Sequence, residues 1–359
     1  MKNNILLSIK FNLYSRVALL SVLFSFFLLT TATASGGDDK PFNITEMINH
    51  HILDAHEWHF YTTTDEAGKE HHVSLPLPII LYTEGEPAVF LSSEFHHAEN
   101  GIVTKGSYNY KLSHEHIQVV DAQGNVQSDI HPMDFSITKN VTSMMLASFL
   151  LLIVGFSIAG AYKKREGKAP KGMQSFFEPI IVFLRDDLAI PNIGEHKYKK
   201  YFPYLLTLFF FIWFNNLLGL IPTGANTSGN IAFTMTLAVL TLIITNVSGN
   251  KHYWKHVFAM PGVPIPLLLI MIPVELIGII TKPAALMIRL FANITAGHTI
   301  ILALIGIIFI FKNAILGVPI VPFVFLMMCL ELFVALLQAY IFTLLTALFI
   351  GQAVADDHH

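Results

Sequence analysis

Five long apolar segments fill most of the chain beyond residue 140 and determine its fold class. They cover about residues 142–162, 201–221, 230–248, 266 to beyond 310, and 319–351. A helix of ~20 apolar residues crosses the hydrocarbon core of a bilayer, so each segment predicts a spanning helix. The last two are longer than one crossing needs, and we predict that they are tilted, bent at Pro273 or Pro283, or extended beyond the lipid. The pattern predicts an all-α polytopic membrane protein.

A further apolar stretch, MQSFFEPIIVFLRDDLAI at residues 173–190, is too polar to span. Glu178, Arg185, Asp186 and Asp187 interrupt it. An amphipathic helix that lies at the cytoplasmic interface accounts for both its apolar and its charged residues.

The amino-terminal part predicts a signal peptide followed by a small outer domain. Residues 1–34 have a basic leader, an apolar core and the small residues ATA before a cleavage position, although an uncleaved first membrane helix is the alternative. Residues 35–138 are polar and contain the strand-like runs HVSLPLPIILY, PAVFLSS and IQVVDAQGNVQSDI. We therefore predict a β-rich extracytoplasmic domain over 35–138 and a membrane domain over 139–359.

Histidine is concentrated in this predicted outer domain. The residues are His50, His51, His56, His59, His71, His72, His96, His97, His114, His116 and His131. Neutral imidazole is a common metal ligand, so metal binding is one interpretation. Because the spacings match no ligand motif, we favour a solvated domain with surface histidines and no metal site.

Lysine and arginine orient the predicted spans. The segment KKREGKAPK at 163–171 carries five Lys or Arg against one Glu, so the positive-inside rule makes it cytoplasmic. The basic stretches KYKK and KHYWKH then also lie inside, whereas PTGANTSG and KNAILGV lie outside. This orientation agrees with an exported amino-terminal domain and places the carboxyl terminus in the cytoplasm.

Composition supports a membrane protein and excludes several functions. The chain is 53% hydrophobic and 13% charged, with a mean hydropathy of +0.56, whereas soluble proteins are about 25% charged. A net charge of −3 gives no reason to expect a nucleic-acid partner. Cys329 is the only cysteine, which excludes an intramolecular disulfide and zinc sites built on cysteine pairs. The sequence has no phosphate-binding glycine loop, so we predict neither a nucleotide site nor a cofactor.

The fourth apolar segment carries polar residues at different depths. At ~1.5 Å and ~100° per residue, Glu275 lies ~21 Å closer to the cytoplasm than Arg289 and near the same face. Asn293 shares the Arg289 face, whereas His298 lies ~13 Å further out on roughly the opposite face. An arginine at this depth is costly and calls for an anionic partner. No acid occurs at its level on the last two segments, which points to a partner on another chain.

The fifth segment returns with Glu331 about two turns outside Gln338 and on the same face. If Gln338 is level with Arg289, then Glu331 lies near the level of His298. Histidine and carboxylate groups take up and release protons, whereas arginine keeps its proton. Titratable groups on both sides of a fixed cation suit two proton paths separated by a barrier.

Each of these assignments has a structural alternative. Glu275 could extend its carboxylate to the membrane interface, and the histidine–glutamate pair could simply join two helices. Asn215, Asn216 and Asn246 are of a type that more often stabilises helix packing in membranes.

The sequence resembles the a subunit of F-type ATP synthases, the membrane stator beside the rotating c ring of the Fo sector. The resemblance covers about residues 170–352 and rests on four ordered blocks. They are FFFIWFNNLLGLIP (209–222), PVELIGIITKPAAL (273–286), RLFANITAGH (289–298) and LLQAYIFTLLT (336–346). It implies a non-catalytic proton-channel subunit without a cofactor, which works with the c-subunit ring, the b subunit of the stator stalk and other subunits of the synthase. The secretory signal and the outer domain favour a bacterial inner membrane as its location.

The resemblance also implies roles for particular residues in the proton path. Arg289 matches the essential arginine that faces the carboxylate of each passing c subunit. His298 and Glu331 match two positions of the outer half-channel, although some bacterial members carry this pair the other way round. Gly219 stands where some members carry an acid, which puts that contribution in doubt.

Four further residues match polar positions of the family. Asn216 matches a residue of the outer path, and Gln338 matches a glutamine that faces the arginine. Asn293 matches a common polar neighbour of the arginine, and Glu275 matches an acid linked to the inner exit. The resemblance says nothing about the outer domain.

Two other functions are compatible with intramembrane acids, histidine and arginine. One is a proton-coupled secondary transporter, which would bind a small substrate and work without a ring. The other is an outer metal-binding sensor anchored by a membrane bundle, which would require metal affinity in residues 35–138.

Overall fold

The structure is a computed structural model that describes residues 53–64, 70–113, 115–121, 123–221, 224–258, 264–311 and 313–355. The predicted signal peptide, residues 1–34, lies outside the described residues, as do His50, His51 and His114.

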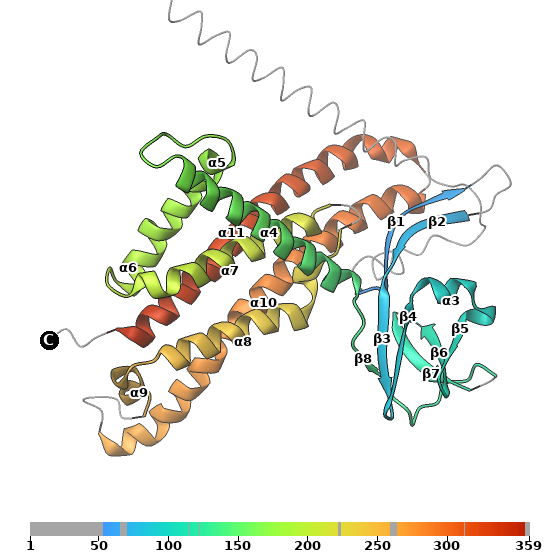
Figure 1. Ribbon diagram of the computed structural model, residues 1–359, viewed down its shortest axis with the longest axis horizontal. Coiled ribbons are helices and arrows are strands. Elements are labelled where there is room, and N and C mark those ends of the chain that lie inside the picture. Colours follow the sequence, from blue (N-terminus) through green and yellow to red (C-terminus); the bar gives the residue numbers. More distant parts are fainter. Residues whose placement is uncertain are drawn as a thin grey trace, which may run out of the picture. The chain divides into compact units, whose positions relative to one another are not determined.

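Five helices of the described residues are long and apolar enough to cross a membrane, as the sequence predicted. They are α4 (Lys139–Lys164), α7 (Tyr198–Gly219), α8 (Ile231–Ser248), α10 (Ile265–Phe311) and α11 (Gly317–Val354). In Figure 1, α10 lies beside α8 and α11, and α11 also packs against α7. Helix α10 continues across both Pro273 and Pro283, because neighbouring turns keep the remaining backbone hydrogen bonds. The mostly helical fold class is confirmed.

The predicted amphipathic segment forms three consecutive helical pieces. They are α5 (Met173–Phe183), a π-helical turn (Leu184–Ala189) and α6 (Ile190–Ile193). Phe177, Leu184 and Leu188 are buried in the same core as α7 and α11, whereas the Asp186 and Asp187 side chains are exposed. The segment thus has one apolar and one charged face. A shorter helix, α9 (Lys251–Phe258), connects α8 to the chain leading into α10.

The core of the helical part is built from aromatic and branched side chains of α7, α10 and α11. Leu205 and Ile212 of α7, Leu290 of α10, and Phe342 and Ile350 of α11 belong to one buried cluster. Their spacing of about one or two turns gives each helix an apolar stripe toward its neighbours. This packing fixes the polar residues that lie on the same helices.

The amino-terminal part contains eight strands and a short helix in the described residues. The elements are β1 (Glu57–Thr64), β2 (Glu70–Pro76), β3 (Pro78–Thr83), β4 (Glu86–Leu91), α3 (Ser93–His97), β5 (Ile102–Lys105), β6 (Tyr108–Ser113), β7 (His116–Val120) and β8 (Met133–Asp134). Strands β1 and β2 pair with each other, and two three-stranded sheets have the orders β4-β3-β8 and β5-β6-β7. Both three-stranded sheets contribute to one core that includes Ile79, Leu81, Phe90, Tyr110 and Val119.

One predicted strand is shorter than the sequence indicated. The run that begins at Ile117 ends as a strand at Val120, because Asp121 starts a turn. Its carboxylate accepts hydrogen bonds from the backbone N–H groups of Gln123 (2.9 Å) and Asn125 (2.8 Å). An aspartate that binds the following backbone in this way competes with strand formation.

Candidate functional site

Arg289 lies on the surface of α10 rather than in the core of the chain. The buried face of the helix at this level is formed by Leu286 (1% exposed), Leu290 (0%) and Ile294 (5%), and the guanidinium lies at its flank. In the described part of the chain, Arg289 has neither a hydrogen bond nor an ion pair. A permanent cation exposed at membrane depth requires compensation from outside the described residues.

A polar pair lies one helical turn beyond Arg289 and joins α10 to α11. The Nδ2 of Asn293 donates a hydrogen bond of 3.0 Å to Oε1 of Gln338. Gln338 is only 2% exposed, and its Nε2 has no partner among the described residues. An unpaired buried amide is costly, so this nitrogen calls for a hydrogen-bond acceptor that the described residues do not supply.

The His298 imidazole is held between α7 and α11. Its Nε2 lies 2.9 Å from the carbonyl oxygen of Gly219, which can only accept, so Nε2 carries a proton. Its Nδ1 lies 3.6 Å from Oε1 of Glu331, whose side chain is 8% exposed. With Nε2 donating to Gly219, Nδ1 and the carboxylate are the two positions of the pair that can bind a further proton, and no hydrogen bond joins them. Both positions have low solvent exposure.

Gly297 makes room for this carboxylate. A Cβ atom added at Gly297 would overlap Oε1 of Glu331 and would lie 3.1 Å from its Cγ. Any larger residue would therefore push the carboxylate away from His298. Gly297 directly precedes His298 in α10. The glycine leaves space for the Glu331 carboxylate, and the histidine lies beside the same carboxylate.

Asn216 connects the end of α7 to the same region. Its Nδ2 donates to the carbonyl oxygen of Ala335 at 3.2 Å, one turn after Glu331 on α11. Its Oδ1 accepts a hydrogen bond of 2.6 Å from the hydroxyl of Ser228. Ser228 belongs to a 3-10 turn, Thr227–Gly229, that leads into α8. Polar groups thus continue from the loop before α8 to the Glu331 region.

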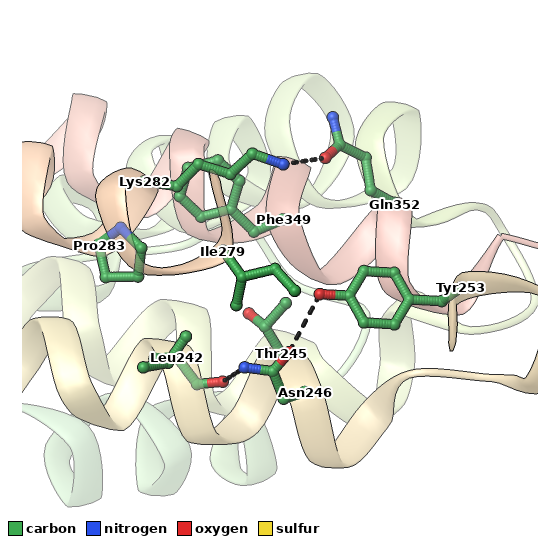
Figure 2. Close-up of a pocket in the computed structure, with 9 residues that line it drawn as sticks. All are labelled: Leu242, Thr245, Asn246, Tyr253, Ile279, Lys282, Pro283, Phe349 and Gln352. Carbon is green, nitrogen blue, oxygen red and sulfur yellow. Dashed lines mark hydrogen bonds between the residues drawn. The ribbon is translucent and has the colours of Figure 1, made fainter. Parts of the chain in front are cut away.

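A pocket lies between α8, α9, α10 and α11 (Figure 2). Along α10 it comes before Arg289, whereas His298 comes after Arg289. Its lining residues are Leu242, Thr245, Asn246, Tyr253, Ile279, Lys282, Pro283, Phe349 and Gln352. The hydroxyl of Tyr253 donates to Oδ1 of Asn246 at 3.0 Å, and Nζ of Lys282 donates to Oε1 of Gln352 at 3.5 Å. The side chain of Thr245 presents a buried hydroxyl that has no partner within the described ranges.

Glu275 lies one turn before this pocket on α10 and is half-buried. Burial raises the pKa of the Tyr253 hydroxyl, and the charge of Glu275 raises that pKa further. The carboxylate is therefore close enough to the pocket to act electrostatically on its wall. It stands apart from the His298 group, with Arg289 between the two along the helix.

Sequence reasoning found seven of these polar residues but missed others. The seven are Arg289, Asn293, Gln338, Glu275, His298, Glu331 and Asn216. The structure brings Asn293 into hydrogen-bond contact with Gln338, and His298 close to Glu331. Sequence reasoning did not find Ser228, the Gly219 carbonyl or Lys282. A lysine inside an apolar segment is a readable signal, whereas a backbone carbonyl and a loop hydroxyl acquire their positions only from packing.

Two described histidines of the amino-terminal part, His56 and His96, form pairs with acids. His56 is 4% exposed, and its Nε2 lies 2.8 Å from Oδ2 of Asp134. His96 lies 2.7 Å from Oε2 of Glu57 and is exposed. Among the described residues, no group of three or more His, Cys, Asp or Glu has the arrangement of a metal site.

Two protein families match different parts of the chain. Residues 141–351 match the family described as ATP synthase A chain, and residues 47–135 match a domain of unknown function (DUF8433).

Similar proteins occur in several bacteria. ATP synthase subunit a 2 of Chlorobaculum tepidum is 49% identical over 239 residues, which cover 64% of this chain and 67% of that protein. ATP synthase subunit a of Chloroherpeton thalassium is 46% identical over 235 residues, which cover 64% of this chain and 70% of that protein. ATP synthase subunit a of an Anaeromyxobacter species is 41% identical over 260 residues, 68% of this chain and 63% of that protein.

Proposed function

Because the chain belongs to the ATP synthase A chain family, we propose that it is the proton-translocating stator subunit of an F-type ATP synthase. It forms two half-channels that carry protons to and from the carboxylates of a c-subunit ring, and so couples proton flow to ring rotation and ATP synthesis. The observation that carries the proposal is the exposed Arg289, which has no partner in the described part of the chain and lies between two separate polar regions.

The outer half-channel follows the polar groups of α7, α10 and α11. Ser228 and Asn216 line the outer entrance with hydrogen-bonding groups, and His298 and Glu331 are the groups of this region that take up and release protons. Transfer between such groups needs contacts near 3 Å, directly or through one water. The 3.6 Å between Nδ1 of His298 and Oε1 of Glu331 is longer than such a contact, so transfer between them proceeds through a water molecule.

Arg289 acts as the barrier between the half-channels. Its positive charge favours the ionised form of a carboxylate that approaches from the ring, because an opposite charge within a few ångströms stabilises the anion. Arginine does not release its proton in proteins, so protons do not pass along it. A proton can cross only when the ring carries it around. Asn293 is exposed one turn beyond Arg289 and donates a hydrogen bond to the buried Gln338.

The inner half-channel begins at the pocket beside Pro283 and ends near Glu275. Thr245, Asn246, Tyr253 and Lys282 give the pocket polar walls where the rest of α10 is apolar. Protons that leave the ring reach the cytoplasm through these groups.

Membrane orientation follows from the basic segments. The loop after α4, the start of α7 and α9 carry Lys and Arg and lie in the cytoplasm together with the carboxyl terminus. The amino-terminal domain, residues 35–138, lies in the periplasm of a bacterial cell whose inner membrane holds the complex, after cleavage of a signal peptide at 1–34. Spans α10 and α11 are tilted, and α5 lies in the interface. The subunit has no nucleotide site of its own and works with the c ring, the b subunit and the other synthase subunits.

ATP-driven proton pumping in inverted membrane vesicles tests the proposal. The Arg289→Ala variant should assemble into the complex and lose pumping, because the ring carboxylate no longer meets a fixed cation. The neighbouring Ile288→Ala change, at a position 57% exposed, serves as the control and should keep pumping. Arg289→Gln provides a second variant if the alanine protein assembles poorly. Pumping at the wild-type rate in either assembled arginine variant would overturn the proposal.

A further inference from the structure

The sheet β4-β3-β8 of the amino-terminal domain has an apolar outward face. Strand register places Ile80 opposite Val89, and Tyr82 opposite Met133. The N–H of Phe135 bonds to the carbonyl of Ile80, which continues the pairing beyond β8. The outward side chains, called here the apolar sheet face, are Ile80, Tyr82, Val89, Leu91, Met133 and Phe135.

This face is exposed in spite of its composition. Val89 and Phe135 are each 64% exposed and Met133 is 62% exposed. The remaining outward positions of the paired strands are Pro78 and Pro87, so no charged side chain lies among the paired outward positions. Contiguous exposed apolar side chains of this kind mark an interaction surface.

The second sheet of the same domain has the opposite character. Strand register puts Thr104 opposite Asn109, and Lys111 opposite Gln118, on its outward side. These four side chains are polar, whereas Ile102 and Val120 on the same side are half-buried and buried. The exposed outward side chains of the second sheet are therefore mainly polar, in contrast to those of the apolar sheet face.

Chain connectivity identifies what covers the apolar sheet face. Phe135 precedes Lys139, the first residue of the spanning helix α4, by four residues. Four extended residues reach at most ~14 Å, which keeps Phe135 close to the lipid headgroups at the end of α4. The basic loop after α4 follows the other end of that helix, so this is the outer leaflet in the positive-inside orientation.

We infer that the apolar sheet face rests on the outer leaflet of the bilayer. Tyr82 is of the aromatic type that is enriched at the membrane interface, and Phe135 adds an exposed apolar ring beside it. The short tether to α4 holds the face near the lipid at a high effective concentration, so even modest affinity per side chain keeps it bound. This inference rests on α4 as a spanning helix and does not depend on proton translocation.

Spin-label accessibility in the full-length protein tests the inference. Cys329 is the only cysteine, so the Cys329→Ser background accepts single labels at Val89→Cys and Phe135→Cys. Thr104→Cys, on the polar face of the second sheet, is the matched control. The three labelled proteins are reconstituted into phospholipid vesicles and probed with oxygen, which partitions into lipid, and with a water-soluble nickel chelate.

We expect the ratio of oxygen to nickel accessibility at residues 89 and 135 to be several-fold higher than at 104. Equal ratios at all three positions would show a face in water and would overturn the inference. Labels at 89 and 135 that are shielded from both reagents would show burial against protein and would overturn it as well.

Discussion

The Nδ1 atom of His298 lies 3.6 Å from Oε1 of Glu331, across the boundary between α10 and α11. Because Nε2 donates to the carbonyl of Gly219, Nδ1 and the carboxylate are the two neighbouring positions left to bind a further proton. The two residues therefore work as one unit, and changes to them should not have independent effects.

Exchange of the two residues tests this unit. Glu331→Gln keeps the size of the side chain but removes its proton, so we expect ATP-driven pumping to fall by about tenfold or more, the effect of ~1.4 kcal/mol on a barrier. The double change His298→Glu with Glu331→His restores both groups in reversed positions and should recover part of the pumping. The single variants His298→Glu and Glu331→His give the pumping expected if the two changes acted independently. A double variant that pumps no better than this expectation would contradict the interpretation of the pair as one unit.

Gly297→Ala should impair pumping although it adds only one methyl group. The new Cβ would overlap the Glu331 carboxylate, which is the far end of a flexible side chain, so we expect the carboxylate to move from its place beside His298. Gly278→Ala on the same helix is the matched control, because nothing lies within 4 Å of its added Cβ. Both changes raise helix propensity alike, so a difference in pumping between the two assembled variants reports the carboxylate displacement. Equal pumping would show that Glu331 moves without consequence.

Gly351→Ala should lower the stability of the helical part. A Cβ at Gly351 of α11 would overlap the backbone carbonyl oxygen of Asn192 at the end of α6, and backbone cannot rotate away as a side chain can. We expect the midpoint of thermal unfolding in detergent to fall, in keeping with a loss of ~1–3 kcal/mol. Gly317→Ala, in the first turn of α11 with open space around it, should leave the midpoint unchanged. A normal midpoint for Gly351→Ala would mean that α6 shifts freely.

Asp134 should make the free energy of unfolding of the amino-terminal domain decrease at low pH. Burial alone would raise the pKa of this carboxyl, but hydrogen bonds from His56 and Ser136 and the charge of His56 lower the pKa to about 2. The depressed pKa stabilises the fold above the unfolded pKa of about 4, and the stabilisation is lost as pH falls toward 2. Since the side chain is 35% exposed, we expect only about 1 kcal/mol.

Hydrogen exchange of residues 53–138 in the full-length chain measures this contribution. Asp134→Asn should exchange faster than wild type at pH 7, and the difference should disappear near pH 2. Asp129→Asn, at an exposed position of the same domain, should exchange like wild type at both pH values. A difference for Asp134→Asn that persists at pH 2 would assign the effect to lost packing rather than to the charge.

The pattern of apolar residues was sufficient to predict the five long helices and the amphipathic segment after α4. Long hydrophobic runs have few alternative structures in a membrane, because backbone groups must bond within the segment. The amino-terminal domain was harder to predict. Strands β1, β5, β6 and β8 were missed. Strand β8 has only two residues, and the others, such as YNYKLS in β6, mix polar and apolar side chains without a long alternating run.

The candidate site was readable from the sequence only where charged or amide side chains stand in apolar helices. Arg289 and Glu331 are visible in this way, and helix geometry estimates their depths. The carbonyl of Gly219 carries no side-chain signal, and Ser228 lies in an ordinary polar loop. Both enter the site because α7 ends beside α10, which depends on tertiary packing.

The exposed Arg289 also has a consequence for how cells make this protein. A chain that presents an uncompensated guanidinium to lipid is energetically disfavoured as long as it stands alone. We expect newly inserted chains to be short-lived until a subunit with a membrane-embedded acid binds them, because quality-control proteases remove proteins that stay incompletely folded. Chains made in excess of this partner subunit would then be degraded, because Arg289 stays uncompensated in them.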